Sequence, residues 1–447
     1  MSDTPKKPKV PCYRQRGDQG LVTLTDAHSK RRRDYWLGPY AAPASRELYH
    51  RVIADWEAGG RRWPTLRSEG PAADANALTI AELVRQYWRW AQGYYHPRRA
   101  GAIKTALRLL RQYYGQTPAP AFGPRKLRLL REQMVRGDAQ AEPPRMPWSR
   151  RYVNSQVQCL RHVFKWAAAQ ELLPAAAHQG LCALEPLRRG RTAARENPKV
   201  GPVPEYLLEA TLPQLSPPVR ALVELQRLSG ARPGELLALR PCDLQMDPQA
   251  GVWTYRPHEH KNAFREQERI LYLGPRAQAV IAPFLLGRAT QAYLFSPAEA
   301  EASRRQALRA ARKTPLSCGN RPGTHRREHP EHQPGQRYTT DSYRKAIEYA
   351  CAKAFPPPAE LAAQPGETRA QWRARLTGEQ KAQLRAWRKE HRWHPHQLRH
   401  NAATELRRSF GLEAAQLALG HASAQITDAV YAERDQAKVM EVMRRIG

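Results

Sequence analysis

Tyr431 is the residue near the end of this chain best placed by its neighbours to act as a nucleophile. It follows His421 by ten residues and lies downstream of residues 396–399, which read His-Gln-Leu-Arg. A phenol oxygen can attack a phosphodiester and hold the phosphate as a covalent ester. The attack needs cations that neutralise the non-bridging oxygens and an acid that protonates the departing sugar oxygen. Arg399, with Arg232 far upstream, could supply the cations, so the set indicates phosphoryl transfer.

The His-Gln-Leu-Arg motif is predicted to open a helix. His396 and Arg399 are three residues apart, just after Pro395, which can begin a helix. Both side chains should therefore emerge on one face and converge on one phosphate. Gly411 is expected to end this helix, and a short helix should follow to Gly420.

The other motif residues are also expected near helix ends. His421 should lie in the turn after that short helix, and Ser423 can cap the next helix, which carries Tyr431 toward its far end. Far upstream, Pro233 is expected to begin a helix directly after the first arginine of the set. Glu235 would then face the positive end of that helix.

The composition of the chain indicates a nucleic-acid partner and a reducing compartment. Its 447 residues contain 73 Lys and Arg against 41 Asp and Glu, and the formal net charge of +32 is spread along the chain. Double-stranded DNA is the obvious polyanion. The six cysteines are dispersed without a C-x-x-C pair, which favours reduced thiols. The charged residues 1–10 lack an apolar core and no apolar run reaches membrane length, so neither a secretory leader nor a membrane span is predicted. We expect a cytoplasmic, nucleoid-associated protein.

A histidine cluster raises the question of a metal. His325, His329 and His332 could suggest zinc, but they lie among Pro, Gly and Arg residues. The favoured interpretation is a structural or solvated role, because the spacing does not match that of zinc sites. No metal and no other cofactor are therefore predicted.

Residues 1–66 are predicted to form a small sheet backed by one helix. The runs 20–25 and 34–38 have β-branched and aromatic content, and residues 44–58 repeat apolar side chains at helical spacing. The basic loop 29–33 is either a phosphate contact or a solvated turn. Its candidate DNA contacts are Arg31, Arg32 and Arg33.

Residues 77–187 are predicted to form an all-helical domain. Thr79 can cap its first helix, and helical patterns recur as far as Glu171. Basic residues fall on helix ends and polar faces between tyrosines and tryptophans, which suits a DNA backbone but also suits a plainly solvated face. The candidate DNA contacts are Arg98, Arg99, Lys104, Arg150 and Arg151.

Residues 200–447 are predicted to form the third domain. Strand-like runs at 252–255 and 269–273 flank a polar segment and imply a hairpin or a three-stranded ribbon. The long basic region 298–392 is either an extra contact with DNA or a neighbouring protomer, or a disordered insertion. The predicted fold is thus multidomain and mainly α: a small α+β domain, an all-α domain, and a mixed α/β domain with a small β-ribbon.

The order of these motifs resembles that of the tyrosine recombinases, the family of the phage integrases. In that family an arginine, a lysine in a β-hairpin, H-x-x-R, L-G-H and a tyrosine follow one another. By this resemblance Arg232 and Arg399 bind the phosphate, and Lys261 is the general acid. Arg265 competes with Lys261, because the register of a hairpin cannot be fixed from the sequence. Tyr431 corresponds to the nucleophile.

The resemblance also assigns the supporting residues and the partners. His396 and His421 would assist proton transfer, and Glu235 would support the first arginine. The chain would then integrate or excise a mobile element through a 3′-phosphotyrosyl ester, without ATP or a metal. A homotetramer on two DNA sites would exchange the strands, with a possible accessory DNA-bending protein or excisionase. Residues 1–66 would resemble an arm-type binding domain and residues 77–187 a core-binding (SAM-like) domain, the two together forming a clamp on DNA.

Two other functions compete with recombination. A type IB topoisomerase would use the same phosphate chemistry without pairing two sites, although the Leu-Gly-His turn near a tyrosine favours the recombinase. A non-catalytic DNA-binding protein would explain the charge but not the ordered motifs. Taken alone, an Arg-Pro-Gly-Glu run is more often a helix start than an active site, and a lone histidine or tyrosine is more often packed or hydrogen-bonded than catalytic.

Overall fold

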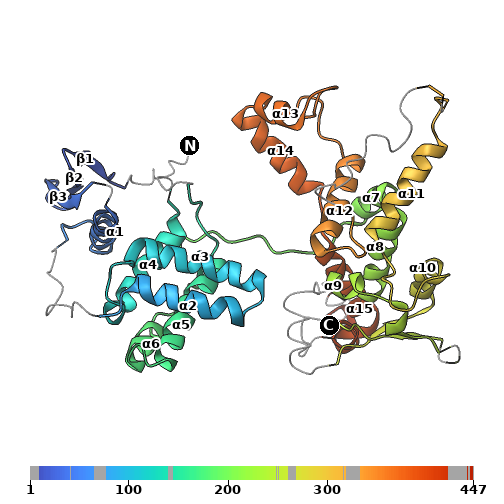
Figure 1. Cartoon of the computed structure of the whole chain (residues 1–447), viewed down its shortest axis with the longest axis horizontal. Coiled ribbons are helices and arrows are strands. Elements are labelled where there is room, and N and C mark those ends of the chain that lie inside the picture. The colour runs from blue at the N-terminus through green and yellow to red at the C-terminus, as the bar shows by residue number, and fades with distance from the viewer. Residues whose placement is uncertain are drawn as a thin grey trace. The chain divides into compact units, whose positions relative to one another are not determined.

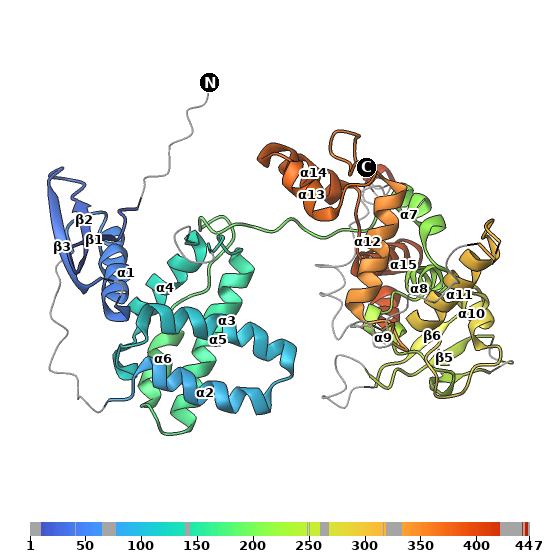
Figure 2. The same ribbon diagram turned by 45° about the horizontal axis from the view of Figure 1, so that its top comes forward.

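The computed structural model describes residues 10–40, 42–64, 77–138, 144–247, 249, 251–259, 268–315, 317–318, 333–420, 440 and 443–445. The chain divides into two compact units, residues 1–198 and 199–447, and each is described by itself. The described residues are mainly helical with two small antiparallel sheets, which confirms the predicted fold class (Figure 1, Figure 2). Among the described helices, none is long and apolar enough to cross a membrane.

The first unit begins with a three-stranded antiparallel sheet in the order β1-β2-β3. β2 (Gln19–Thr25) and β3 (Arg32–Pro39) bury one face, and α1 (Pro43–Ala58) covers it, as their apolar spacing predicts. β1 (Arg14–Arg16) escapes prediction because all three of its residues are exposed and show no alternation.

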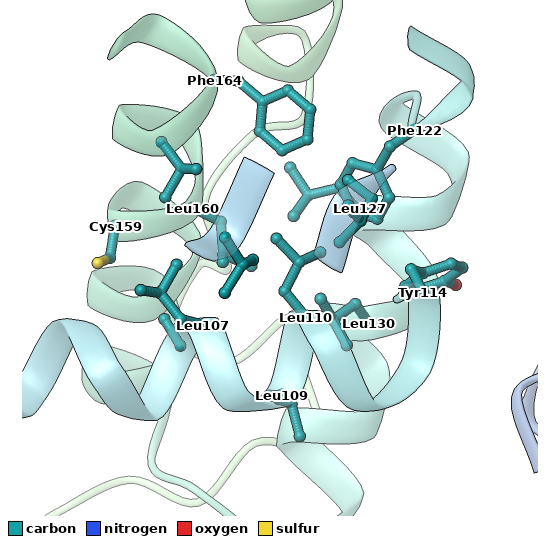
Figure 3. Packing of buried hydrophobic residues seen from close by; sticks show 14 of the residues in the cluster. Leu107, Leu109, Leu110, Tyr114, Phe122, Leu127, Leu130, Cys159, Leu160 and Phe164 are labelled. Carbon is teal, nitrogen blue, oxygen red and sulfur yellow. The ribbon is translucent and has the colours of Figure 1, made fainter. Parts of the chain in front are cut away.

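A larger helical core follows in the same unit. It contains α2 (Ile80–Tyr94), α3 (Pro97–Tyr114), η1 (Ala119–Ala121), α4 (Pro124–Arg136), α5 (Arg150–Ala169) and α6 (Ala175–Cys182). The helices pack through leucine and aromatic side chains such as Leu110, Leu160 and Phe164 (Figure 3). Thr79 caps α2 as predicted: its hydroxyl accepts the Glu82 amide at 3.3 Å, and the Glu82 carboxylate accepts the Thr79 amide at 2.9 Å.

Within this unit, α1 packs against the helical core through a buried carboxylate. Glu47, 4% exposed, accepts the Thr117 hydroxyl at 2.6 Å and the Gln116 amide at 3.2 Å. Arg125 also pairs with Asp55 at 2.9 Å. The sheet and the helical core are therefore joined by specific polar contacts, and their division into separate domains stays a prediction.

The second unit is built around α8, which packs against α10, α12 and α15. Its helices are α7 (Glu205–Thr211), η2 (Leu212–Gln214), α8 (Pro217–Ser229), α9 (Pro233–Leu237), η3 (Pro241–Asp243), α10 (Pro275–Leu285), α11 (Pro297–Ala310), α12 (Thr340–Ala354), α13 (Arg369–Arg375), α14 (Gly378–Glu390) and α15 (Pro395–Leu419). Its antiparallel ribbon has the order β4 (Leu244–Gln245), β5 (Trp253–Tyr255), β6 (Leu271–Leu273), which confirms the predicted ribbon. Gly411 interrupts α15 with φ 89°, close to where the sequence predicts a helix end.

The basic region 298–392 contains two different kinds of structure. α12 places Tyr343 and Ile347 in the main core of the unit. α13 and α14, by contrast, pack on each other around a separate small cluster of Leu361, Leu376, Leu384 and Trp372. The described part of this region is therefore helical, and one of its helices belongs to the main core.

Replacing Glu47 by Ala should loosen the packing of α1 on the helical core. The Thr117 hydroxyl would lose its acceptor while buried, at a cost of about 1–3 kcal/mol. We expect the opening free energy measured by native-state hydrogen exchange at the Gln116 amide to fall by that amount. Glu185→Ala, which removes an exposed carboxylate of the same unit, is the control. Equal protection in the two variants would contradict a stabilising role for Glu47.

Candidate active site

Arg399 joins three segments that are far apart in the sequence. Its side chain is completely buried on the first turns of α15. One terminal nitrogen donates to the Gly230 carbonyl at 2.7 Å, and the other donates to the Leu419 carbonyl at 2.7 Å. The Gly230 carbonyl precedes the Arg232 motif, and Leu419 begins the Leu-Gly-His motif. One guanidinium group therefore joins the H-x-x-R motif, which contains Arg399, to the residues before Arg232 and to the first residue of the Leu-Gly-His motif.

Two glycines make room for this arrangement. Gly230 ends α8 with φ 62°, and a Cβ there would lie 2.6 Å from Cδ2 of Leu419 and 3.1 Å from Cβ of Ala402. Gly420 ends α15 with φ 63°. Both positions need the left-handed backbone that glycine adopts without a steric penalty. At Gly230, glycine also allows the two motifs to pack in direct contact.

Arg232 and Glu235 form an ion pair at the start of α9. The Arg232 guanidinium donates to the Glu235 carboxylate at 2.8 Å, and the Arg232 amide donates to the same carboxylate at 3.0 Å. The Arg232 side chain keeps 25% of its surface exposed, whereas Glu235 is buried. Burial alone would raise the pKa of the Glu235 carboxyl, but Arg269 and Arg232 outweigh it and the pKa lies below its ordinary value. Glu235 is therefore an anion that orients a partly exposed cation.

A buried glutamine ties the Arg232 segment to the start of α15. The Gln226 amide nitrogen donates to the Ala231 carbonyl at 3.3 Å and to the Pro395 carbonyl at 2.9 Å. Its amide oxygen accepts the Tyr343 hydroxyl at 3.2 Å. Gln226 thus fixes the backbone beside Arg232 relative to the backbone beside the H-x-x-R motif.

His396 lies next to this cationic group as a neutral imidazole. Burial lowers its pKa to about 4, and the charges of His400, Arg399, His394 and Arg232 act in the same direction. The ring of His400 lies 6.0 Å from that of His396, one helical turn along α15. At neutral pH, His396 can therefore accept or donate a hydrogen bond without adding a further positive charge.

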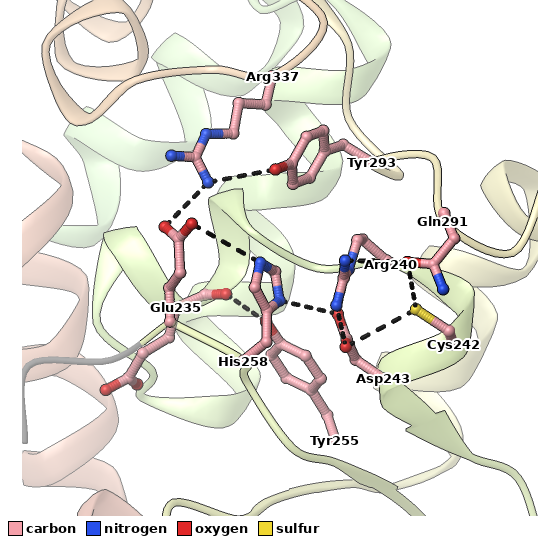
Figure 4. A network of polar contacts seen from close by, with 10 residues as sticks. Glu235, Arg240, Cys242, Asp243, Tyr255, His258, Gln291, Tyr293 and Arg337 are labelled. Carbon is pink, nitrogen blue, oxygen red and sulfur yellow. Dashed lines mark hydrogen bonds and ion pairs between the residues drawn. The ribbon is translucent and has the colours of Figure 1, made fainter. Parts of the chain in front are cut away.

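The ribbon that leads to Lys261 is anchored by a polar network (Figure 4). The Tyr255 hydroxyl donates to the Glu235 carbonyl at 2.5 Å, which joins β5 to α9. Asp243 pairs with Arg240 at 2.8 Å and lies 3.2 Å from Nδ1 of His258. The segment is thus held firmly up to the last described residues before the predicted lysine.

Several predicted site residues lie outside the described residues. They are Lys261 and its competitor Arg265, His421, and the nucleophile Tyr431. Arg232, Glu235, His396 and Arg399 are the predicted residues that the structure brings together. The histidines at 325, 329 and 332 also lie outside the described residues. Within the described ranges, no group of three or more metal-ligating side chains could hold a metal ion.

The candidate DNA contacts of the first unit occupy different environments. Lys104 is exposed and lines a cavity of about 450 Å³ between α2 and α3, together with Trp88 and three arginines. Arg150, by contrast, is engaged in an ion pair with Glu196 and donates to the Leu187 carbonyl at 3.2 Å. The remaining described candidates with exposed side chains are Arg31, Arg32, Arg33, Arg99 and Arg151. Arg98 lies in α3. DNA contact by all eight stays a prediction.

Sequence analysis missed three residues of the site. Gln226 sits within an apolar helix, His400 lies one turn beyond the H-x-x-R motif, and Arg269 begins the run that leads into β6. The sequence did contain one signal for Arg269. It is a charged residue at the start of an apolar strand, and a charge in such a position is buried only when it has a partner.

A model of the Phage integrase family matches residues 363–438. The matched segment contains α15 and every motif residue from His396 to Tyr431. This C-terminal part of the chain is therefore similar to the phage integrase family. None of the curated proteins compared with the chain matches it.

Solved structures of two integrases resemble the chain at low identity. The integrase of the Tn1549 transposon, in complex with transposon right end DNA, is 15% identical with a TM-score of 0.48, covering 82% of this chain and 99% of that one. A lambda integrase dimer bound to a COC′ core site is 13% identical with a TM-score of 0.49, covering 97% and 99%. At these scores the likeness carries no argument, and the similarity to the family rests on the match over residues 363–438.

Replacing Gln226 by Met should disturb the site as well as its stability. Two carbonyls and the Tyr343 hydroxyl would lose their buried partner, at a cost of about 1–3 kcal/mol for a buried group left without one. We expect a lower midpoint of denaturant unfolding and a His396 pKa, measured by NMR, that moves from about 4 toward its ordinary value.

Gln278→Met is the matched control, because Gln278 also bridges two carbonyls but lies beside the ribbon. It should lower the unfolding midpoint without moving the His396 pKa. An unchanged His396 pKa in both variants would contradict the positioning role of Gln226.

Proposed function

We propose that the chain is a site-specific DNA recombinase that cleaves and rejoins DNA through a 3′-phosphotyrosyl intermediate. In this function it integrates or excises a mobile element. The observation that carries the proposal is the contact of Arg399 with both the Gly230 and Leu419 carbonyls. It gathers three motifs of a phosphoryl-transfer site around one buried cation, in a chain of net charge +32.

In the proposed reaction, the phenol oxygen of Tyr431 attacks the phosphorus and the bond to the 5′ oxygen breaks. Lys261 gives its proton to that 5′ oxygen. Arg232 and Arg399 bind the non-bridging oxygens and stabilise the charge that develops in the transition state. The 5′ hydroxyl of a partner strand then attacks the ester and releases Tyr431, so the energy of the phosphodiester is conserved.

The electrostatic arrangement supports this division of roles. Glu235 carries one negative charge beside Arg232 and Arg269, and Arg399 adds a third cation. An entering phosphate diester would bring the compensating negative charge. His396, neutral because burial lowers its pKa to about 4, is suited to hydrogen bonding with the phosphate.

Arg399 must become accessible for its proposed contact. Its side chain is completely buried in the free protein. Binding of DNA would therefore have to displace the groups that cover it, while the Gly230 and Leu419 carbonyls keep its plane fixed. Arg232, with 25% of its side chain exposed, needs only to turn away from Glu235.

The number of strands to be exchanged determines the number of protomers in the proposed assembly. Two duplexes contain four strands to be cut, and each protomer offers one nucleophile, so we propose a homotetramer on two sites of double-stranded DNA. The basic residues of the first unit would bind the phosphate backbone beside the cleavage position. An accessory DNA-bending protein or an excisionase would determine the direction of the reaction.

Replacing Tyr431 by Phe should keep DNA binding and abolish the covalent adduct, because only the nucleophilic oxygen is lost. The measurement uses a nicked suicide substrate cut from the flanks of the chain's own gene, and it detects a denaturant-stable adduct on a gel. Tyr349→Phe, at an exposed tyrosine of α12, is the control and should form the adduct normally. An adduct formed by Tyr431→Phe would remove this residue as the nucleophile. A two-site assay then distinguishes recombination from relaxation.

Replacing Arg232 by Lys should slow single-turnover cleavage by roughly two orders of magnitude or more, the scale for losing one donor to the transition state. A lysine keeps the charge but loses the planar fork that reaches two oxygens. Arg220→Lys, at an exposed ion pair on α8, is the control and should cleave at the normal rate. Cleavage within a few-fold of the wild type would exclude Arg232 from phosphate binding, and cleavage blocked by EDTA would indicate a metal nuclease.

A further inference from the structure

Arg269 is a buried cation to which the proposed reaction assigns no task. It lies at the start of the segment that enters β6, and its side chain is 8% exposed. Its Nε lies 3.7 Å from Oε2 of Glu235, and a terminal nitrogen donates to the Ala418 carbonyl at 3.4 Å. A guanidinium group is expensive to bury unless its partners are well placed. The position of Arg269 therefore calls for an explanation.

Glu235 lies between two guanidinium groups that approach it differently. Arg232 is 2.8 Å from one carboxylate oxygen, and Arg269 is 3.7 Å from the other. The Nε–H of Arg269 is buried and makes no hydrogen bond to any described residue. Arg269 is thus close enough to Glu235 for an ion pair but has a donor still to be used.

The other partner of Arg269 is the end of α15. The last carbonyls of a helix receive no hydrogen bond from within the helix, so they need donors from elsewhere. A cation at this end also interacts favourably with the helix dipole. Arg269 donates a hydrogen bond to the Ala418 carbonyl, and Arg399 donates one to the Leu419 carbonyl. A Cβ on Gly420 would lie 2.8 Å from Cζ of Arg269, so the turn closes directly over the guanidinium group.

We propose that Arg269 is a positioning residue that holds the Glu235 carboxylate when Arg232 turns from Glu235 to the scissile phosphate. At the same time it fixes the turn that precedes His421. This inference rests on the proposed function and deepens it. Arg269 touches neither the substrate nor the nucleophile in this role.

The electrostatics around Glu235 give the inference a distinctive signature. The groups that face this residue are Arg232, which precedes α9, Arg269, and the Tyr255 phenol on β5, which donates to the Glu235 carbonyl. His396 on α15 is affected in turn by Arg232. Burial favours the protonated carboxyl, and the charge of Arg269 together with the charge and hydrogen bonds of Arg232 lowers the pKa of Glu235. Without Arg269 that pKa should rise, and Glu235 should take up a proton as the pH falls.

The test compares Arg269→Gln, Arg269→Lys and the wild type in single-turnover cleavage of the suicide substrate between about pH 5.5 and pH 9. An ordinary carboxyl is already ionised throughout this range, so only a raised carboxyl pKa changes the profile there. For Arg269→Gln we expect an acid limb that the wild type lacks, with a loss of about tenfold for each pH unit below the raised pKa. Arg269→Lys should restore most of the wild-type profile. Adding Glu235→Gln to Arg269→Gln should remove the acid limb, because no carboxyl is left to titrate.

Arg288→Gln is the matched control. Arg288 also bridges a glutamate and a backbone carbonyl, with contacts to Glu299 at 2.7 Å and to the Tyr293 carbonyl at 3.0 Å, away from the motifs. It should lower the thermal unfolding midpoint as Arg269→Gln does, without producing an acid limb. The same pH profile in the wild type, Arg269→Gln and Arg288→Gln would overturn the inference.

A second measurement separates this inference from the proposed function. The Glu235 carboxyl can be titrated by carbon-13 NMR in the free protein, with no DNA present. We expect its pKa to be higher in Arg269→Gln than in the wild type, and an equal pKa in both would overturn the inference. If the wild type forms no adduct but the Glu235 pKa is raised in Arg269→Gln, the proposed function is overturned. The interaction of Arg269 with Glu235 is then still established.

Discussion

The contact of the buried Arg399 guanidinium with two backbone carbonyls is the constraint on which the site depends. The Gly230 and Leu419 carbonyls belong to the ends of α8 and α15, where helices leave acceptors without partners. A cation at each helix end satisfies those acceptors and the helix dipole together. Because both helices end on a single planar group, Gly230 and Leu419 are fixed relative to each other. Gly230 lies two residues before Arg232, and Leu419 is the first residue of the Leu-Gly-His motif.

The charge of the site follows from this packing. Arg232 and Arg269 flank one carboxylate, Glu235, and Arg399 donates to the carbonyl of Gly230 two residues before Arg232, so the cations exceed the anions before any substrate arrives. Gathering like charges costs free energy, part of which Glu235 and the carbonyls offset. Burial, with the charges of His400, Arg399, His394 and Arg232 acting in the same direction, lowers the pKa of His396 to about 4 and keeps it neutral. A site prepared in this way stabilises an incoming negative charge with little reorganisation.

Short-range patterns allowed much of this structure to be predicted from the sequence. Pro395, Gly411 and Gly420 mark the limits and the interruption of α15 as expected, and the ribbon follows from two strand-like runs. Arg232 and Glu235 could be paired because they are three residues apart at a helix start. Gln226 and Arg269 could not be placed at the site, because the contacts that bring them to α15, with Pro395 and Ala418, join residues about 150 or more positions apart, and no local period encodes such contacts. β1 was missed because an exposed strand of three residues has no apolar alternation.

The close packing of the motifs has a consequence for experiments on them. The Leu419 side chain packs against Gly230, and Leu398 in the H-x-x-R motif lies in the main core of the unit. A large change at these positions would therefore leave a cavity or a clash in the core as well as disturb the chemistry. Loss of activity by itself does not distinguish the two causes. Substitutions that keep the volume and change one hydrogen-bonding group, combined with a pKa measured at a neighbouring residue, separate the positioning of the charges from the stability of the fold.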